Sequence, residues 1–152
     1  MKLLLTFTLI LLFNSCSNMK PSDYKNTKPE IKIEQYFLGE VEAWGILQSR
    51  SGKVKRQFTA EMNGTINENN LMLNENFSWN DGEKQKRLWT IKKIGENKYE
   101  GRAADVIGVA KGSSYGSAFK FEYQLLIPFK DKKIKVKFDD WIFKQDDRVA
   151  IN

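Results

Sequence analysis

Residues 119–127 read FKFEYQLLI, and this stretch decides the fold class. Apolar and polar side chains alternate along it. One face carries Phe119, Phe121, Tyr123, Leu125 and Ile127. A period of two with a single apolar face is typical of an antiparallel strand that covers one core. We therefore expect the aromatic side chains of this strand to point inward and to be largely buried.

The same alternation occurs on both sides of this stretch, in KVKRQFTAEM (53–62) and KIKVKFDDWIF (133–143). Turn signals separate such stretches at Ser51-Gly52, Glu68–Asn70, Asp81-Gly82, Gly95–Asn97 and Pro128–Lys132. The pattern predicts an all-β fold of seven to eight strands in up-and-down order. Sequential hairpins of this number favour a lipocalin-like antiparallel barrel or a strongly curved sheet.

Three segments depart from plain alternation. The Asn63-Gly64 pair predicts a bulge within one long strand. Residues 30–37, EIKIEQYF, predict a short helix or a loose first strand. Residues 101–118 are rich in glycine and predict a strand, a long flexible hairpin loop and the next strand. That loop either has no special role or gates a cavity at the mouth of the barrel.

Composition limits the classes of function. The chain has 152 residues, 41% of them hydrophobic and 29% charged, which indicates one globular domain. It has no histidine and one cysteine, so the commonest general base and the commonest metal ligand are absent. We predict no metal, no cofactor and no enzymatic activity, although a Ser-Lys or two-carboxylate mechanism stays open. The net charge of +6 indicates either solvated strand faces or contact with anionic lipid headgroups, rather than nucleic acid.

The N-terminus predicts export. Lys2 precedes an apolar run, Leu3–Phe13, which is too short to cross a bilayer. Ser15 and Cys16 follow it and resemble the processing site of bacterial lipoproteins. Residues 1–15 are then a signal peptide, residues 16–30 a flexible tether and residues 31–152 a single domain. The alternatives are an ordinary signal peptide or a buried free cysteine.

Acylation of Cys16 explains the single thiol, because it removes a reactive group from an oxidising compartment and anchors the chain in a membrane. The residue after the cysteine is Ser17 rather than aspartate. In a diderm bacterium this resembles the sorting signal for the outer membrane. We therefore expect a cell-envelope protein, anchored in the outer membrane and facing the periplasm.

Asp140 is the sharpest anomaly in the alternation. In the register of Ile134, Val136 and Phe138 it lies on the apolar face, whereas Asp139 lies on the lysine face. An unpaired carboxylate in a core is costly, so Asp140 must find hydrogen-bond donors or reach water. We expect the donor to be Arg87, Arg102 or backbone amides, in a buried ion pair or at the base of a ligand cavity.

Several other side chains are candidates for ligand contact or barrel closure. The tryptophan of the AWG segment resembles the residue that plugs one end of lipocalin barrels, although it is equally a large core residue. Trp79 and Trp89 flank the Asp81-Gly82 turn and are expected to be cross-strand packing partners. The full candidate set is Trp44, Arg87, Trp89, Arg102, Phe119, Phe121, Tyr123, Asp140 and Trp141.

Four segments together resemble a known family. They are EQYFLGEVEAWGILQSRSGKVKRQF, LMLNENFSWNDGEKQKRLWTI, YEGRAADVIGVAKGSSYGSAF and FDDWIFKQDD. Their order and spacing, from about Tyr36 to Asn152, resemble an uncharacterised family of bacterial lipoproteins, domain of unknown function 3833. The resemblance implies an exported, envelope-associated protein, but no catalytic residue. Family members continue past the DDW segment, so we expect this chain to be shortened and its barrel to be incomplete at the C-terminus.

These observations support two main functions. The first is binding or handling of a lipid or another small hydrophobic ligand, which a cavity of a few hundred cubic ångströms would favour. The second is a structural or accessory lipoprotein that docks a partner protein, which an exposed apolar patch would favour. An enzyme that uses carboxylates alone is a weaker third hypothesis.

Overall fold

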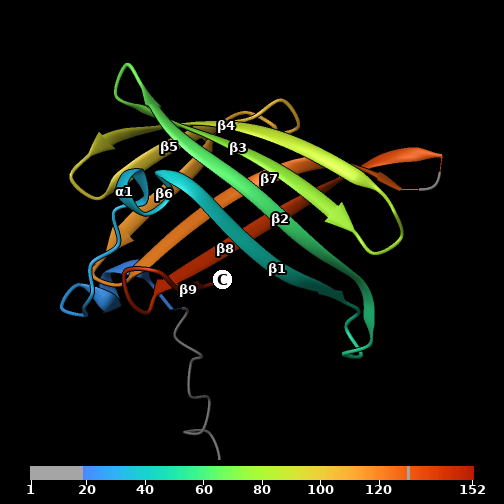
Figure 1. Cartoon of the computed structure of the whole chain (residues 1–152), viewed down its shortest axis with the longest axis horizontal. Helices are drawn as coiled ribbons and strands as arrows, with labels where there is room; N and C mark the ends of the chain where they lie inside the picture. Colours follow the sequence, from blue (N-terminus) through green and yellow to red (C-terminus); the bar gives the residue numbers. More distant parts are fainter. Residues whose placement is uncertain (1–18, 130) are drawn as a thin grey trace, which may run out of the picture.

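A computed structural model describes residues 19–129 and 131–152. Within these residues nine strands form one antiparallel sheet in sequence order. The sheet is strongly curved and makes a half-barrel (Figure 1). The strands are β1 (Gly39–Gln48), β2 (Val54–Asn67), β3 (Asn70–Trp79), β4 (Lys84–Gly95), β5 (Lys98–Arg102), β6 (Ala110–Tyr115), β7 (Ala118–Phe129), β8 (Lys132–Lys144) and β9 (Ala150–Ile151). The predicted fold class is confirmed.

The strand number is higher than the predicted seven to eight. The glycine-rich segment does not form one long hairpin loop, because residues 110–115 make β6 and pair with β5 and β7. The connecting loop is residues 103–109. The short strand β9 pairs with the end of β8 and adds the ninth strand.

β2 is one long strand, as predicted, but it has no bulge at Asn63-Gly64. Its pairing with β1 and β3 is regular at Gly64, and the irregularity with β1 lies at Leu47/Gln48 instead. Gly64 is needed for packing, since a Cβ atom there would collide with the carbonyl oxygen of Phe37. The glycine therefore allows the segment after α1 to approach the strand.

Two short helical segments precede the sheet, η1 (Pro21–Tyr24) and α1 (Ile33–Tyr36). α1 lies at one end of the half-barrel (Figure 1) and corresponds to the short helix predicted for EIKIEQYF. No helix in the two described ranges is long and apolar enough to span a membrane.

The segment before α1 packs on the sheet, which differs from the flexible tether expected for residues 16–30. The hydroxyl groups of Thr27 and Ser117 share a hydrogen bond of 2.8 Å, and the amide of Ile31 donates to the carbonyl of Gly116 at 2.8 Å. The Tyr24 ring contacts Phe143 edge-on, with centroids 5.2 Å apart. Residues 16–18, the predicted signal peptide and Cys16 lie outside the described residues.

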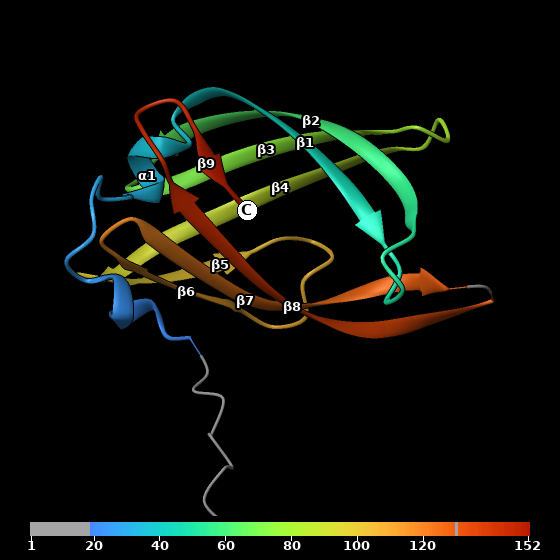
Figure 2. The same ribbon diagram turned by 90° about the horizontal axis from the view of Figure 1, so that it is seen from below.

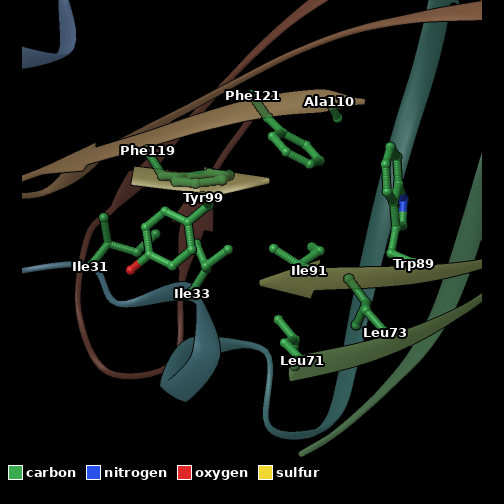
Figure 3. Close-up of a cluster of buried hydrophobic side chains, with 10 residues drawn as sticks. All are labelled: Ile31, Ile33, Leu71, Leu73, Trp89, Ile91, Tyr99, Ala110, Phe119 and Phe121. Carbon is green, nitrogen blue, oxygen red and sulfur yellow. The ribbon is translucent and has the colours of Figure 1, made fainter. Parts of the chain in front are cut away.

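The core lies on the inner face of the curved sheet, nearer to α1. Phe119 and Phe121 are buried there, as predicted, and Tyr123 is half-buried. Figure 3 shows Phe119 and Phe121 projecting from β7 towards side chains of β4, β5 and the α1 segment. The cluster consists of Ile31, Ile33, Leu71, Leu73, Trp89, Ile91, Tyr99, Ala110, Phe119 and Phe121.

The half-barrel has two different ends (Figures 1 and 2). We call the end that carries α1 the helix end. The opposite end holds the β1–β2, β3–β4 and β7–β8 connections, and we call it the hairpin end. Among the described residues β1 and β8 do not pair with each other, so the barrel stays open along one side.

Candidate functional site

The inner face of the β3–β4 hairpin places three pairs of side chains in successive layers. Leu71 lies opposite Ile91, Leu73 opposite Trp89, and Glu75 opposite Arg87. The first two pairs belong to the core, so the third begins a polar layer directly beside it. Three of the predicted candidate residues meet in this layer, namely Arg87, Tyr123 and Asp140.

Arg87 is held by a carboxylate from the 103–109 loop. Its Nε atom lies 3.1 Å from both carboxylate oxygens of Asp105, and its Nη2 atom lies 2.8 Å from Oδ2. The loop is fixed in turn, because the amide of Ile107 donates to the carbonyl of Gln124 at 2.8 Å. Burial lowers the pKa of Arg87, but the hydrogen bond and charge of Asp105 outweigh this effect and raise the pKa above its usual value.

Glu75 lies opposite Arg87 without a hydrogen bond to it. The Glu75 Oε2 and Arg87 Nη1 atoms are 3.6 Å apart, and Oε2 is a buried atom with no hydrogen-bond partner among the described residues. Burial raises the pKa of Glu75 to about 7, against the opposing effects of Arg87 and the Trp89 indole. Since the guanidinium is already bound by Asp105, burial outweighs the ion pair at this carboxyl group.

Asp140 lies on the inner face, as the alternation predicts, but the predicted donor is wrong. The hydroxyl group of Tyr123 donates to Asp140 Oδ2 at 2.6 Å, whereas Arg87 is bound by Asp105 and Arg102 is exposed on the outer face of β5. Burial raises the pKa of Asp140, while the Tyr123 hydrogen bond and the Arg87 charge oppose the increase. Burial beside Asp140 also raises the pKa of Tyr123.

Asp139 lies on the opposite face, as predicted. Its Oδ1 atom is 3.3 Å from Nζ of Lys120, and its side chain is exposed. The neighbouring aspartates of the DDW segment therefore have different environments, and only Asp140 takes part in the polar layer.

The aromatic candidates of the inner face belong to the core. The Trp89 ring packs against Phe121 at 5.1 Å and against Tyr123 at 5.3 Å. Trp79 does not pack against Trp89, contrary to expectation. It contacts Phe58 at 5.1 Å, and the Arg56 guanidinium lies 4.0 Å above its ring. Each tryptophan thus packs across strands, but on different sides of the polar layer.

Two further tryptophans lie on the outer face. Trp44 is 71% exposed, so it neither fills the core nor plugs the barrel. The inner position beside it is Gly45, where a Cβ atom would collide with the Phe58 ring. Trp141 is half-buried on the outer face, where it stacks on Phe143 with centroids 5.9 Å apart.

A cleft of about 610 Å³ opens at the helix end. Its apolar lining comes from α1 and from the inner faces of β2, β3 and β4, namely Ile33, Ile66, Leu71 and Ile91. Glu34, Lys93 and Tyr99 supply polar atoms. This cleft was not predicted, because its residues come from segments that are far apart in the sequence and carry no shared motif.

The polar groups of the cleft bind one another. Glu34 accepts hydrogen bonds from Lys93 Nζ at 3.0 Å and from the Tyr99 hydroxyl group at 2.9 Å. Burial opposes ionisation of Glu34, but its backbone hydrogen bond and these two donors hold its pKa below the usual range. Burial, followed by the hydrogen bond to Glu34, raises the pKa of Tyr99.

A second, shallower groove of about 560 Å³ lies where β1, β2 and β3 are neighbours. Trp44 and Ile46 line it together with polar residues of β2 and β3, including Gln57, Thr59 and Ser78. It places the most exposed tryptophan in a depression of the sheet surface.

Sequence analysis missed two acidic residues of the polar layer, Glu75 and Asp105, and only Glu75 could have been predicted from the sequence. Glu75 continues the inner alternation of Leu71 and Leu73, so the signal was present in LMLNENF. Asp105 lies in a loop, where no periodicity indicates direction. Within residues 19–129 and 131–152, no group of three or more acidic or cysteine side chains is arranged to hold a metal ion.

Comparison with known proteins gives one match. The model of a family described as protein of unknown function (DUF3833) matches residues 10–152. No curated protein and no solved structure is significantly similar to the chain.

Proposed function

The chain belongs to DUF3833, a family of proteins of unknown function, and we propose that it binds a small hydrophobic or lipid-like ligand in the helix-end cleft. The observation that carries this proposal is the cleft itself. Its volume of about 610 Å³ lies within the range of small-molecule sites, which are mostly apolar with a few placed polar groups.

The lining favours an amphipathic ligand. Ile66 is a large apolar side chain that remains 47% exposed beside the buried Leu71 and Ile91. Lys93, Glu34 and the Tyr99 hydroxyl group offer both donors and acceptors within the same cleft. A molecule with an acyl or similar apolar part and one polar head fits this distribution. The expected aromatic contacts are replaced by aliphatic ones, because Phe119 and Phe121 fill the core.

The same proposal includes the location of the protein. Cys16, preceded by Ser15 and the apolar run Leu3–Phe13, supports acylation and an envelope lipoprotein that faces the periplasm from the outer membrane. A lipid anchor would hold the cleft close to a supply of amphipathic ligands. It would require no transmembrane helix.

A substitution that fills the cleft tests the binding site. We expect Ile66→Trp in the full chain to weaken binding of a fluorescent fatty-acid analogue by about tenfold or more, because the indole occupies the apolar space. Native mass spectrometry with lipid extraction should show less copurified ligand. Ile94→Trp is the control, since Ile94 is 50% exposed and does not line the cleft. Equal binding by wild type and both variants would contradict the proposal.

The outer-face groove supports the alternative, an accessory lipoprotein that docks a partner protein. Trp44 and Ile46 are large exposed side chains, and tryptophan is enriched where few residues carry most of the binding energy. Pull-down with Trp44→Ser separates the two functions. Loss of a specific partner with unchanged fatty-acid binding would favour docking over ligand binding.

A further inference from the structure

Charge is distributed unevenly along the half-barrel. The hairpin end comprises residues 46–56, 79–86 and the described residues of 126–136. It has nine basic and three acidic residues, a formal charge of +6. The remaining described residues have fourteen basic and sixteen acidic residues, a formal charge of −2. The basic character of the chain therefore belongs to one end.

The basic side chains of this end are mostly exposed. They belong to three connections and the strand ends beside them, and Figures 1 and 2 show these connections at the same end of the half-barrel. Arg56 is bound by Asp81 and Glu83 at 2.7 Å each. No other basic residue of the hairpin end has an ion pair within the described ranges. The exposed ones are Arg50, Lys53, Lys55, Lys84, Lys86, Lys132, Lys133 and Lys135.

Large apolar side chains are exposed at the same end. Ile46, Leu47 and Val54 flank the β1–β2 connection, and Leu126 lies near the β7–β8 connection. If these lysines only kept the strand surface solvated, large exposed aliphatic side chains beside them would have no explanation. Aliphatic side chains that project among basic ones are typical of surfaces that enter the headgroup region of a membrane.

We propose that the hairpin end docks on an anionic lipid bilayer, with the basic side chains at the headgroups and Leu47 and its neighbours entering the interface. Charge complementarity decides this partner, since anionic lipids attract basic residues near the surface. The exposed aliphatic side chains distinguish a bilayer from a soluble polyanion, which offers them no apolar phase. The contact is separate from the helix-end cleft and from any lipid on Cys16.

Vesicle binding tests the electrostatic part. The full chain is compared with Lys53→Gln/Lys55→Gln/Lys133→Gln on phosphatidylcholine vesicles with and without phosphatidylglycerol. Each lysine removed should weaken binding to anionic vesicles roughly fivefold, so the triple variant should bind about 100-fold more weakly. Lys92→Gln/Lys98→Gln/Lys111→Gln is the matched control, because these three lysines are exposed but lie outside the hairpin end. All proteins in this assay also carry Cys16→Ser, so that an acyl chain at this position does not anchor them in either type of vesicle.

Leu47→Ser tests the apolar part. Leu47 is 50% exposed at the hairpin end, and Leu88, 53% exposed in the middle of β4, provides the control Leu88→Ser. Only Leu47→Ser should weaken binding to anionic vesicles, by about threefold to tenfold, and neither variant should alter binding to heparin. Equal losses in both triple variants, or equal binding to neutral vesicles, would overturn the proposal. An unchanged Leu47→Ser variant would show that the end is a general polyanion surface.

Discussion

Glu75 is a buried carboxyl group whose hydrogen bonds and ion pair do not compensate for its burial. Its carboxyl group lies in the polar layer between the core and the hairpin end. Arg87 is hydrogen-bonded to Asp105, and Glu75 Oε2 has no hydrogen-bond partner among the described residues. Asp140, the other inward carboxylate of the layer, has a short hydrogen bond from Tyr123. Of the two acids that strands β3 and β8 contribute to the layer, Asp140 therefore has a hydrogen-bond donor and Glu75 Oε2 has none among the described residues, and burial makes Glu75 favour its neutral form.

The raised pKa of Glu75 predicts that the stability of the protein decreases as pH rises. Its folded pKa of about 7 exceeds the ordinary value of 4.5, so its contribution is complete below about pH 4.5 and is lost as pH rises through about 7. A tenfold change in proton affinity corresponds to about 1.4 kcal/mol, so a rise in pKa from 4.5 to about 7 changes the free energy of unfolding by roughly 3 kcal/mol. Glu75→Gln should be more stable than wild type by up to this amount near pH 8.

Urea unfolding of wild type and Glu75→Gln across this pH range measures the effect. The free energy of unfolding of the variant should depend less on pH between about 5 and 8. Glu61→Gln, an exposed glutamate of the neighbouring β2, is the control and should follow wild type. A Glu75→Gln variant that is less stable than wild type near pH 8 would mean that its ion pair with Arg87 outweighs burial.

At the scale of elements, β7 organises the core. Its inner residue Phe121 contacts Trp89, Phe119 and Tyr123 with ring centroids 5.1–5.6 Å apart. The ring also lies over Gly101 of β5, where a Cβ atom would collide with it. One side chain of β7 thus joins two strands that are not its neighbours in the sheet.

Phe121→Ala should lower the free energy of unfolding by about 3–5 kcal/mol, because it leaves a cavity in a packed aromatic cluster. Leu126→Ala on the outer face of the same strand should cost less than about 1 kcal/mol, since Leu126 is 46% exposed. Urea midpoints of the two variants provide the comparison. Fatty-acid binding should not change in Phe121→Ala, because Phe121 does not line the helix-end cleft. Similar midpoints would show that the inner face of β7 is misassigned.

The elements that sequence analysis predicted are those with large alternating side chains. The apolar rows of β2, β7 and β8 indicated both strand and face, and they placed Asp140 correctly. β6 was missed because Gly112, Ser113 and Ser114 carry no apolar period. The packing of η1 was missed for a related reason. Tyr24 and Thr27 stand alone in a polar segment, and their partners, on β8 and in the β6–β7 turn, are defined only by the fold.

Site residues were predictable only where direction followed from the strand. Phe121, Tyr123 and Asp140 lie on the inner face, as their alternation implies. Arg87 and Trp89, whose direction was not predicted, lie on the same face. Their partners could not be chosen from sequence, because Asp105 reaches Arg87 from a loop and leaves Tyr123 to bind Asp140. Trp44 was misplaced because the inner position of β1 next to it is a glycine. Its size predicts a core residue, but the alternation places it on the outer face.

At the scale of the whole molecule, the two ends of the half-barrel have different surfaces. The helix end has a cleft with an apolar lining, and the hairpin end has a formal charge of +6. The two proposals therefore assign separate tasks to separate ends. A protein that takes an amphipathic ligand at one end and contacts anionic lipid at the other would remain close to a membrane.

Cys16 tests how the whole molecule is held at that membrane. If Cys16 is acylated, the wild-type protein should stay in the membrane fraction after a wash at about 1 M salt, where the Debye length is only about 3 Å and electrostatic contacts are screened. Cys16→Ser should be released by the same wash, because only the contact at the hairpin end would remain. Mass spectrometry of the wild-type N-terminus should show the acyl chains, and Ser15→Thr, which keeps Cys16, is the control for changes near the processing site. A Cys16→Ser protein that is processed normally and resists the salt wash would rule out the lipid anchor. The folded domain alone would then have to hold the protein at the membrane.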